Sequence, residues 1–259
     1  RLIAAGVTLV MFLLGFTLLL VLIAIDLRIK SAPDARQKLQ VPILHVFGFL
    51  RNRSLLLPTS QEESAQIEGY RILARPLRAK YPGHGTTFLI TSTADGEGKT
   101  TTAINLAAVY GRQDERELLI DAQIRRAEEP SSFTHLILDE ETPATHGLGE
   151  YLSFKVYDYD QLITPTKLAG VDMIARRASA VIPDLLQSAR MRELMAELKQ
   201  HYSIIIIEGP PVQECVDSDI LASYADSVLF VTASDTLKPD TIQRAIARMQ
   251  QSEAHFEIG

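Results

Sequence analysis

The sequence is short of cysteine and of basic residues, and each shortage restricts what the protein can be. Its 259 residues include one cysteine, Cys215, so an internal disulfide is excluded, which suits the cytoplasm. Nothing beside Cys215 would activate a thiol, and we interpret it as a small residue packed in a loop. The formal net charge of −6 argues against a nucleic-acid binder. The six histidines lack the spacing of metal ligands, so zinc and haem sites are not supported.

Charge is also missing from the start of the chain. No charged residue occurs between Leu2 and Ile25, and about 24 residues at 1.5 Å each are enough to cross the apolar core of a bilayer. A signal peptide would have a shorter apolar run before a small-residue cleavage site, and a buried helix is the other alternative. This run continues instead into the charged residues Asp26, Arg28 and Lys30. We therefore predict a transmembrane helix over residues 1–27, with the basic residues after it placing the chain beyond about residue 28 in the cytoplasm.

Two further parts follow the apolar run. Residues 28–60 contain three prolines among short apolar runs and are predicted to form a juxtamembrane connector. Residues 61–259 provide enough length for one domain of ordinary size. The chain begins at Arg1 rather than methionine and stops at Phe256–Gly259, which resembles the start of another strand. We therefore expect a piece of a longer protein, in which the first helix is the second of two and the C-terminal end is truncated.

A glycine-rich stretch, Thr91–Thr102, lies between a predicted strand at Phe88–Ile90 and a helical pattern at Ala103–Tyr110. Strand, glycine-rich loop and helix start make a phosphate cradle, because backbone N–H groups and the helix dipole converge on the anion. The lysine would reach the terminal phosphates and the following threonine would bind Mg²⁺. The motif is a variant P-loop, or Walker A motif, since Thr93 replaces its first glycine; an ordinary turn with an exposed lysine is the alternative. The predicted nucleotide-binding residues are Asp95, Gly96, Glu97, Gly98, Lys99, Thr100 and Thr101.

The rest of the chain alternates strand and helix patterns, which predicts an α/β fold with a mostly parallel sheet flanked by helices. Four consecutive isoleucines before Glu208 favour a strand covered on both faces. Residues 123–145 are polar and without clear periodicity, which predicts a mobile loop over the site. The predicted strands are Glu117–Asp121, Val171–Ala175, Ser203–Glu208 and Ser227–Val231. The predicted helices are Gln61–Lys80, kinked or ended by Pro76, with Met191–His201 and Pro239–Met249.

Two carboxylates end predicted strands beside the P-loop. Asp121 closes a short apolar strand, and the carboxyl edge of a parallel sheet is where such folds bind ligands. Glu208 closes the isoleucine run, and an aliphatic run ending in an acid is the usual second metal-proximal motif of P-loop proteins. The sequence therefore predicts a metal site formed by Thr100, Asp121 and Glu208.

These residues together resemble the bacterial tyrosine kinases of the polysaccharide co-polymerase type, which act in capsule and exopolysaccharide synthesis and export. The likeness covers nearly the whole chain, and the order and spacing of its motifs are more specific than any one of them. The matching segments are Asp26–Ser31, Glu68–Leu73, Gly96–Thr100, Asn105–Ala107, Leu119–Asp121 with Arg125 and Arg126, Gly147–Leu152, Met191–Leu194 and Gly209–Val212 with Asp217.

The resemblance implies an ATP- and Mg²⁺-dependent protein-tyrosine kinase in a bacterial inner membrane. It implies catalytic roles for Lys99 on the phosphates and for Asp121, which would bind metal or deprotonate the incoming tyrosine, in an in-line phosphoryl transfer. It also implies a homo-oligomeric ring, formed around Glu68, Tyr70 and Arg71, that works with the polysaccharide polymerase and export machinery. The acceptor tyrosines of the family lie in a C-terminal tail that reaches the next subunit.

The sequence departs from the family at three places. Gln123 stands where a second aspartate is usual, Glu208-Gly209 replaces an aspartate–threonine pair, and Ala74 replaces an arginine of the ring-contact helix. An amide cannot replace a carboxylate on Mg²⁺, and an extra methylene moves an oxygen by about 1 Å. A degenerate nucleotide-binding regulatory subunit therefore stays open as the alternative. A partitioning-type ATPase is a third possibility, although Ala94 replaces its signature lysine.

Three tyrosines lie close together with two acids further along the chain. Tyr151, Tyr157 and Tyr159, with Asp158 and Asp160, resemble an acidic phosphate-acceptor patch. Packing of some of these rings, combined with a solvated loop, explains the same pattern and is the interpretation that the sequence favours.

Overall fold

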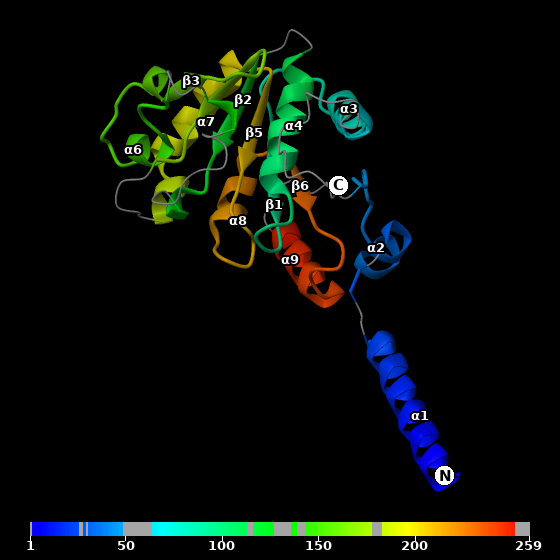
Figure 1. Ribbon diagram of the computed structural model, residues 1–259. Helices are drawn as coiled ribbons and strands as arrows, with labels where there is room; N and C mark the ends of the chain where they lie inside the picture. The colour runs from blue at the N-terminus through cyan, green and yellow to red at the C-terminus, as the bar shows by residue number, and fades with distance from the viewer. Residues whose placement is uncertain are drawn as a thin grey trace.

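The computed structural model describes residues 2–25, 28–29, 31–48, 64–112, 116–126, 136–138, 143–177 and 183–251 (Figure 1). Its centre is a six-stranded sheet in the order β3-β4-β2-β5-β1-β6. The strands are β1 (Thr86–Ser92), β2 (Glu117–Asp121), β3 (Ile163–Pro165), β4 (Val171–Ile174), β5 (Ile204–Glu208) and β6 (Ser227–Val231). Every pairing is parallel except β3 with β4. The predicted α/β fold with a mostly parallel sheet is confirmed.

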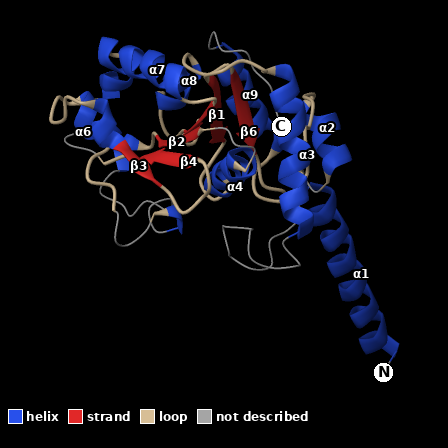
Figure 2. Ribbon diagram, turned by 90° about the horizontal axis from the view of Figure 1, so that it is seen from above, coloured by secondary structure: helices blue, strands red, loops and turns tan. Residues whose placement is uncertain are grey.

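Helices cover both faces of the sheet (Figure 2). On one face lie α3 (Ser64–Lys80) and α4 (Lys99–Gly111), and on the other α7 (Ala189–His201), α8 (Asp217–Ala222) and α9 (Pro239–Gln251). The short helices are α6 (Leu148–Leu152) and the 3₁₀ turns η1 (Ile124–Arg126), η2 (Tyr159–Leu162) and η3 (Pro183–Gln187).

The isoleucine run in β5 shows why the sheet needs two layers of helices. Ile204 and Ile206 belong to the core on the α3–α4 face, whereas Ile205 and Ile207 belong to the core on the other face. Successive side chains of a strand point to opposite faces, so an unbroken apolar run is buried only when both faces are covered. All four side chains are fully buried, as the sequence predicted.

Helix α3 continues through Pro76 to Lys80, so the proline does not end the helix, which was one of the two predicted outcomes. A proline removes one helical N–H and leaves the carbonyl four residues earlier, that of Ile72, without its usual partner. Pro76 is exposed, and the side chain of Ile72 is 53% exposed. Both residues therefore lie on the solvent side of the helix, where water can bond to the freed carbonyl.

A helix that the sequence did not predict, α2 (Ala32–Leu39), lies within the connector. The Ser31 hydroxyl accepts a hydrogen bond from the Asp34 N–H at 3.4 Å, and Pro33 occupies the first turn, so the start signals were present in the sequence. Ala35 and Leu39 are buried in the same core as α9. This part of the connector therefore packs on the domain.

The first helix, α1 (Leu2–Ile25), coincides with the uncharged run inside the predicted residues 1–27 and stands clear of the domain in Figure 1. Those of its large apolar side chains that are described, such as Phe12 and Leu18, are exposed. Nonetheless, no helix in the described part of the chain was found to be both long and apolar enough for a membrane span, so the predicted transmembrane helix is not confirmed.

The remaining predicted elements are confirmed where they are described, with one partial exception. Of the loop at 123–145, the described residues include η1 and the buried Ile137 and Leu138. Residues 127–135 and 139–142 of that loop, and the strand start predicted at Phe256–Gly259, lie outside the described residues.

Candidate functional site

The glycine-rich loop joins the end of β1 to the start of α4, as a phosphate cradle requires. Gly96 and Gly98 have φ angles of 77° and 99°, in the region that other residues rarely adopt. A Cβ at Gly96 would meet no atom within 4 Å, so the backbone conformation, and not crowding, demands glycine there. Gly98 begins α4 without a side chain to cap it. The N–H groups of the first turn are thus left available to an anion.

Lys99 does not sit in solvent. Its side chain is 5% exposed, and Nζ donates to Ser92 Oγ at 3.2 Å and to Asp95 Oδ1 at 3.4 Å. The alternative of an ordinary turn with an exposed lysine is therefore wrong. The ammonium group is held inside the loop by neutral and acidic oxygens, which a phosphate could replace.

The two acids of the loop are placed differently. Asp95 is half exposed and also pairs with Arg126. Burial acts to raise the pKa of Asp95, but its hydrogen bonds and ion pairs with Arg126 and Lys99 outweigh burial and lower that pKa. Asp95 is thus an ionised carboxylate that holds two cations at the mouth of the cradle.

Glu97 is buried and braces the loop from behind. Its Oε2 accepts from the Ala94 N–H at 2.8 Å, and its Oε1 accepts from Thr232 Oγ1 at 3.1 Å and the Ala233 N–H at 3.4 Å. Burial raises the pKa of Glu97 despite these bonds. The side chain therefore fixes the loop against the residues after β6, and any contact with nucleotide would come from the backbone.

Asp121 and Glu208 meet at the carboxyl edge of the sheet. They end β2 and β5, which are hydrogen-bonded neighbours, and lie opposite each other in the register. Thr100 Oγ1, in the first turn of α4, donates to Glu208 Oε1 at 2.6 Å. The sequence-predicted metal residues are thus brought together beside the phosphate cradle.

The two carboxylates have different surroundings. Burial and the negative charge of Asp121 raise the pKa of Glu208 to about 8. Asp121 Oδ1 accepts from the Gln123 N–H at 3.2 Å, and Oδ2 lies 3.8 Å from Arg176 Nε. A nearby guanidinium favours the ionised carboxylate. Burial thus favours a proton on Glu208 in the cation-free site, while Arg176 favours the ionised form of Asp121.

Several neighbours of these acids were missed by the sequence reasoning. The Gln123 side chain lies close enough to Glu208 to lower its pKa slightly, so the two departures from the family pattern are neighbours in the fold. Arg126 binds Glu214 at 2.6 Å as well as Asp95, and Arg125 binds the buried Asp217 through two 2.7 Å bonds. Arg125 and Arg126 belong to the segments that resemble the kinase family, but no pattern in the sequence indicated which acids they would pair with.

The donor atoms fit a small divalent cation. Among the described residues no group of three histidine, cysteine or acidic side chains could hold a metal by itself. However, Glu208 Oε2 is buried without a hydrogen-bond partner, beside the Thr100 hydroxyl and Asp121. Hydroxyl and carboxylate oxygens suit Mg²⁺, which takes its other ligands from phosphate and water. The site is thus suited to a cation that arrives with a nucleotide.

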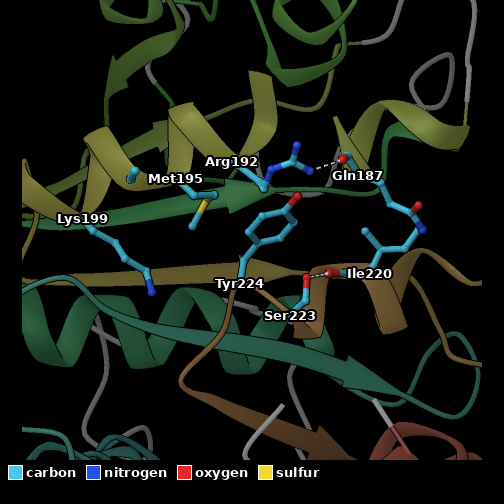
Figure 3. Close-up of a pocket in the computed structure, with 8 residues that line it drawn as sticks. Gln187, Arg192, Met195, Lys199, Ile220, Ser223 and Tyr224 are labelled. Atoms are coloured by element: carbon cyan, nitrogen blue, oxygen red, sulfur yellow. Dashed lines mark hydrogen bonds between the residues drawn. The ribbon is translucent and has the colours of Figure 1, made fainter. Parts of the chain in front are cut away.

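The structure has two cavities of interest, one beside the acids and one away from them. One of about 120 Å³ opens beside the acids and is lined by Gln123, Arg125, Arg126, Pro210, Glu214, Cys215 and Asp217. Burial raises the pKa of the Cys215 thiol, in keeping with a packed loop residue. The other, of about 420 Å³, lies between α7 and α8 (Figure 3), and none of the predicted site residues lines it.

The residues predicted to form a ring contact are only partly accessible. Glu68 and Arg71 form an exposed ion pair at 3.1 Å. Tyr70 is buried against Phe47, with ring centroids 4.2 Å apart, and its burial raises its pKa to about 12. Any contact through this helix would therefore use Glu68 and Arg71 rather than the tyrosine.

Comparison with known proteins agrees with the fold and the site. The family described as an AAA domain matches residues 86–257. Tyrosine-protein kinase YwqD of Bacillus subtilis is 32% identical over 189 residues, covering 71% of this chain and 75% of that protein. Tyrosine-protein kinase wzc of Salmonella typhimurium is 29% identical over 221 residues, covering 83% of this chain but only 29% of the Salmonella protein.

The solved kinase domain of Escherichia coli tyrosine kinase ETK has the same fold, with a TM-score of 0.75 at 22% identity over 88% of this chain and 91% of that domain. A partitioning-type ATPase is disfavoured, because the most similar relatives described above are tyrosine kinases. With its P-loop, its paired acids and these relatives, the chain belongs to the bacterial tyrosine-protein kinases of capsule and exopolysaccharide loci, which carry an AAA-type P-loop domain.

Proposed function

We propose that the chain is the ATP-binding domain of a tyrosine autokinase, which transfers a phosphoryl group from ATP to a tyrosine and thereby regulates capsule or exopolysaccharide synthesis and export. One observation carries the proposal. Thr100, at the start of the P-loop helix, contacts Glu208 at 2.6 Å, and Glu208 lies in register with Asp121. Phosphate cradle, hydroxyl and two carboxylates are the parts that phosphoryl transfer requires.

In this proposal the residues act mainly by position and charge. Lys99 exchanges Ser92 and Asp95 for phosphate oxygens, which it can reach because it already lies inside the loop. A divalent cation bound by Thr100, Asp121 and Glu208 would neutralise charge on those oxygens. Asp121 is the base that takes the proton of the incoming tyrosine, because it ends β2 beside the cradle and Arg176, 3.8 Å from its carboxylate, favours its ionised form.

A second candidate is a regulatory subunit that binds nucleotide without transferring phosphate. Gln123, which lies beside Glu208, favours it, because an amide supplies no negative charge to Mg²⁺ where a carboxylate would. A Glu208 that keeps its proton would also bind Mg²⁺ weakly. In this case nucleotide occupancy, and not phosphorylation, would switch the polysaccharide machinery.

The deciding experiment uses the whole chain in detergent, radiolabelled ATP, MgCl₂ and a soluble glutamate–tyrosine copolymer as acceptor. We expect label on tyrosine, and much less label with Asp121→Asn. Nucleotide binding without label on either the copolymer or the chain would favour the regulatory candidate. If neither binding nor label is found, both candidates are wrong.

The proposal extends to location and assembly. The uncharged run Leu2–Ile25 and the exposed apolar side chains of α1 support attachment of this domain to the inner membrane. The exposed Glu68–Arg71 pair supports a homo-oligomer, in which a ring would bring the site of one copy to a tyrosine of the next. The polysaccharide polymerase and export machinery are the proposed partners.

A further inference from the structure

One tyrosine differs from all the others in its exposure. The chain has eight tyrosines, and all eight lie in the described part. Tyr157 is 76% exposed, the highest value among the large apolar and aromatic side chains on the surface. The buried tyrosines are Tyr70, Tyr110, Tyr151 and Tyr202, and the half-buried ones are Tyr81, Tyr159 and Tyr224. Exposure therefore separates Tyr157 from its sequence neighbours Tyr151 and Tyr159.

The hydroxyl groups differ in the same way. Tyr110 donates to the Ala74 carbonyl at 3.0 Å, Tyr202 to Asp172 at 2.9 Å and Tyr224 to the Leu186 carbonyl at 2.6 Å. Among the described residues, none hydrogen-bonds to the Tyr157 hydroxyl. A phosphoryl acceptor must insert its hydroxyl into a site with the reacting atoms about 3–3.5 Å apart. Tyr157 can do so without breaking any bond.

The loop that carries Tyr157 is firmly held. After α6, Phe154 adopts a φ of 60°, and the Lys155 N–H donates to the Glu150 carbonyl at 2.9 Å. The Arg190 guanidinium donates to the carbonyls of Tyr151 at 2.8 Å and of Val156 at 2.6 Å. It also lies 5.6 Å from the Tyr157 ring. The turn therefore presents Tyr157 in a fixed direction.

The position and charge of this loop suit an approach to the phosphate site of a second copy of the chain. It leads through η2 into β3, whose first residue, Ile163, pairs with Ile174 at the carboxyl end of β4. The strand that follows Tyr157, β3, therefore starts at the same edge of the sheet where Asp121 ends β2. In the sheet β3 lies two strands from β2, which is about 10 Å. Asp158 and Asp160 after it are exposed. The mouth of the phosphate site carries Arg125 and Arg126, which are already paired with acids of their own chain. The acidic loop of a second copy would bind these arginines by replacing one of those partners.

We propose that Tyr157 is a phosphoryl acceptor of this kinase and is presented to the active site of a second copy. The inference rests on the proposed function and names one of its substrates. A bond forms between the Tyr157 oxygen and the terminal phosphorus of ATP while the bond to the bridging oxygen breaks. ADP leaves with that oxygen, and the phenolic proton passes to Asp121 of the copy that holds the nucleotide.

The test mixes two whole chains in detergent. One is the unmutated protein, and the other is a Lys99→Ala chain, marked with heavy nitrogen, that serves only as acceptor. After incubation with MgATP, mass spectrometry of the segment between Lys155 and Lys167 locates phosphate on Tyr157 or Tyr159. We expect phosphate on Tyr157 of the heavy chain. Tyr157→Phe should remove most of this label, while the matched change Tyr159→Phe should leave it nearly unchanged.

The outcomes separate this inference from the proposed function. If the glutamate–tyrosine copolymer is phosphorylated while Tyr157 is not, Tyr157 is no acceptor and the kinase assignment stands. If Tyr157 is labelled only in the light chain, presentation to a second copy is wrong. If neither copolymer nor chain is labelled, both proposals fail. Asp160→Asn should lower the labelling of Tyr157 several-fold, and an unchanged level would remove the role given to the acidic flank.

Discussion

Replacing Glu208 by glutamine should stabilise the protein at alkaline pH while weakening its cation site. Glu208 is fully buried, and burial together with Asp121 raises its pKa from 4.5 to about 8. The folded protein therefore holds a proton that the unfolded chain releases above about pH 4.5. Since the folded state binds more protons, the free energy of unfolding is highest below that pH and falls as the pH rises toward 8.

The size of the effect follows from the pKa difference. Each pH unit in this interval costs about 1.4 kcal/mol, so the whole interval sets an upper bound of about 5 kcal/mol. Between about pH 5.5 and 7.5 the loss is at most about 2.7 kcal/mol, less whatever share belongs to Asp121, because the two groups titrate together. Glutamine cannot ionise, but its oxygen can still accept from Thr100. The variant should therefore lose much less stability over the same range.

The assay is urea unfolding of the whole chain in detergent at several pH values, with nucleotide absent. We expect the difference between the variant and the unmutated protein to grow by about 1–3 kcal/mol from about pH 5.5 to 7.5. Asp121→Asn is the matched control and should flatten the profile only in part, since burial, the larger cause of the raised pKa of Glu208, remains when the charge of Asp121 is removed. Parallel pH profiles for Glu208→Gln and the unmutated chain would show that Glu208 is already ionised, and the raised pKa given to Glu208 would be wrong.

Three further results are expected. Lys99→Ala should abolish ATP binding in calorimetry, because Lys99 is the cation inside the phosphate loop; unchanged affinity would remove the P-loop reading. Gln123→Asp combined with Glu208→Asp should strengthen the Mg²⁺ dependence of ATP turnover, although the shorter acid gives up part of its 2.6 Å bond to Thr100. Turnover equal to that of the unmutated chain would mean that carboxylate positions are not limiting. The whole chain should sediment with membranes without detergent, whereas a chain shortened to begin at Arg28 should remain in the supernatant and still bind nucleotide. The cut is placed before α2 because α2 covers α9. Recovery of the whole chain in the supernatant would contradict membrane attachment.

The sequence alone determined the parts of this protein that depend on local pattern. An apolar run between breakers, such as the four isoleucines of β5, predicts a strand covered on both faces, because no other arrangement buries every side chain. The glycines of the P-loop predict the cradle, since few other residues adopt their φ angles. Asp121 and Glu208 could be assigned to one edge because parallel strands end together.

Only the tertiary structure decided what those residues contact. The register of β2 and β5 places Asp121 opposite Glu208. Their separation in the sequence does not predict that register. Glu97 turns away from the phosphate site because Thr232 and Ala233, more than 130 positions later, supply its hydrogen bonds. Pro76 is tolerated because α3 turns that position toward water. Tyr151, Tyr157 and Tyr159 look alike in sequence, yet packing buries Tyr151 and leaves Tyr157 exposed. Burial depends on contacts with segments that are distant in the sequence, and only the folded structure shows which segments meet.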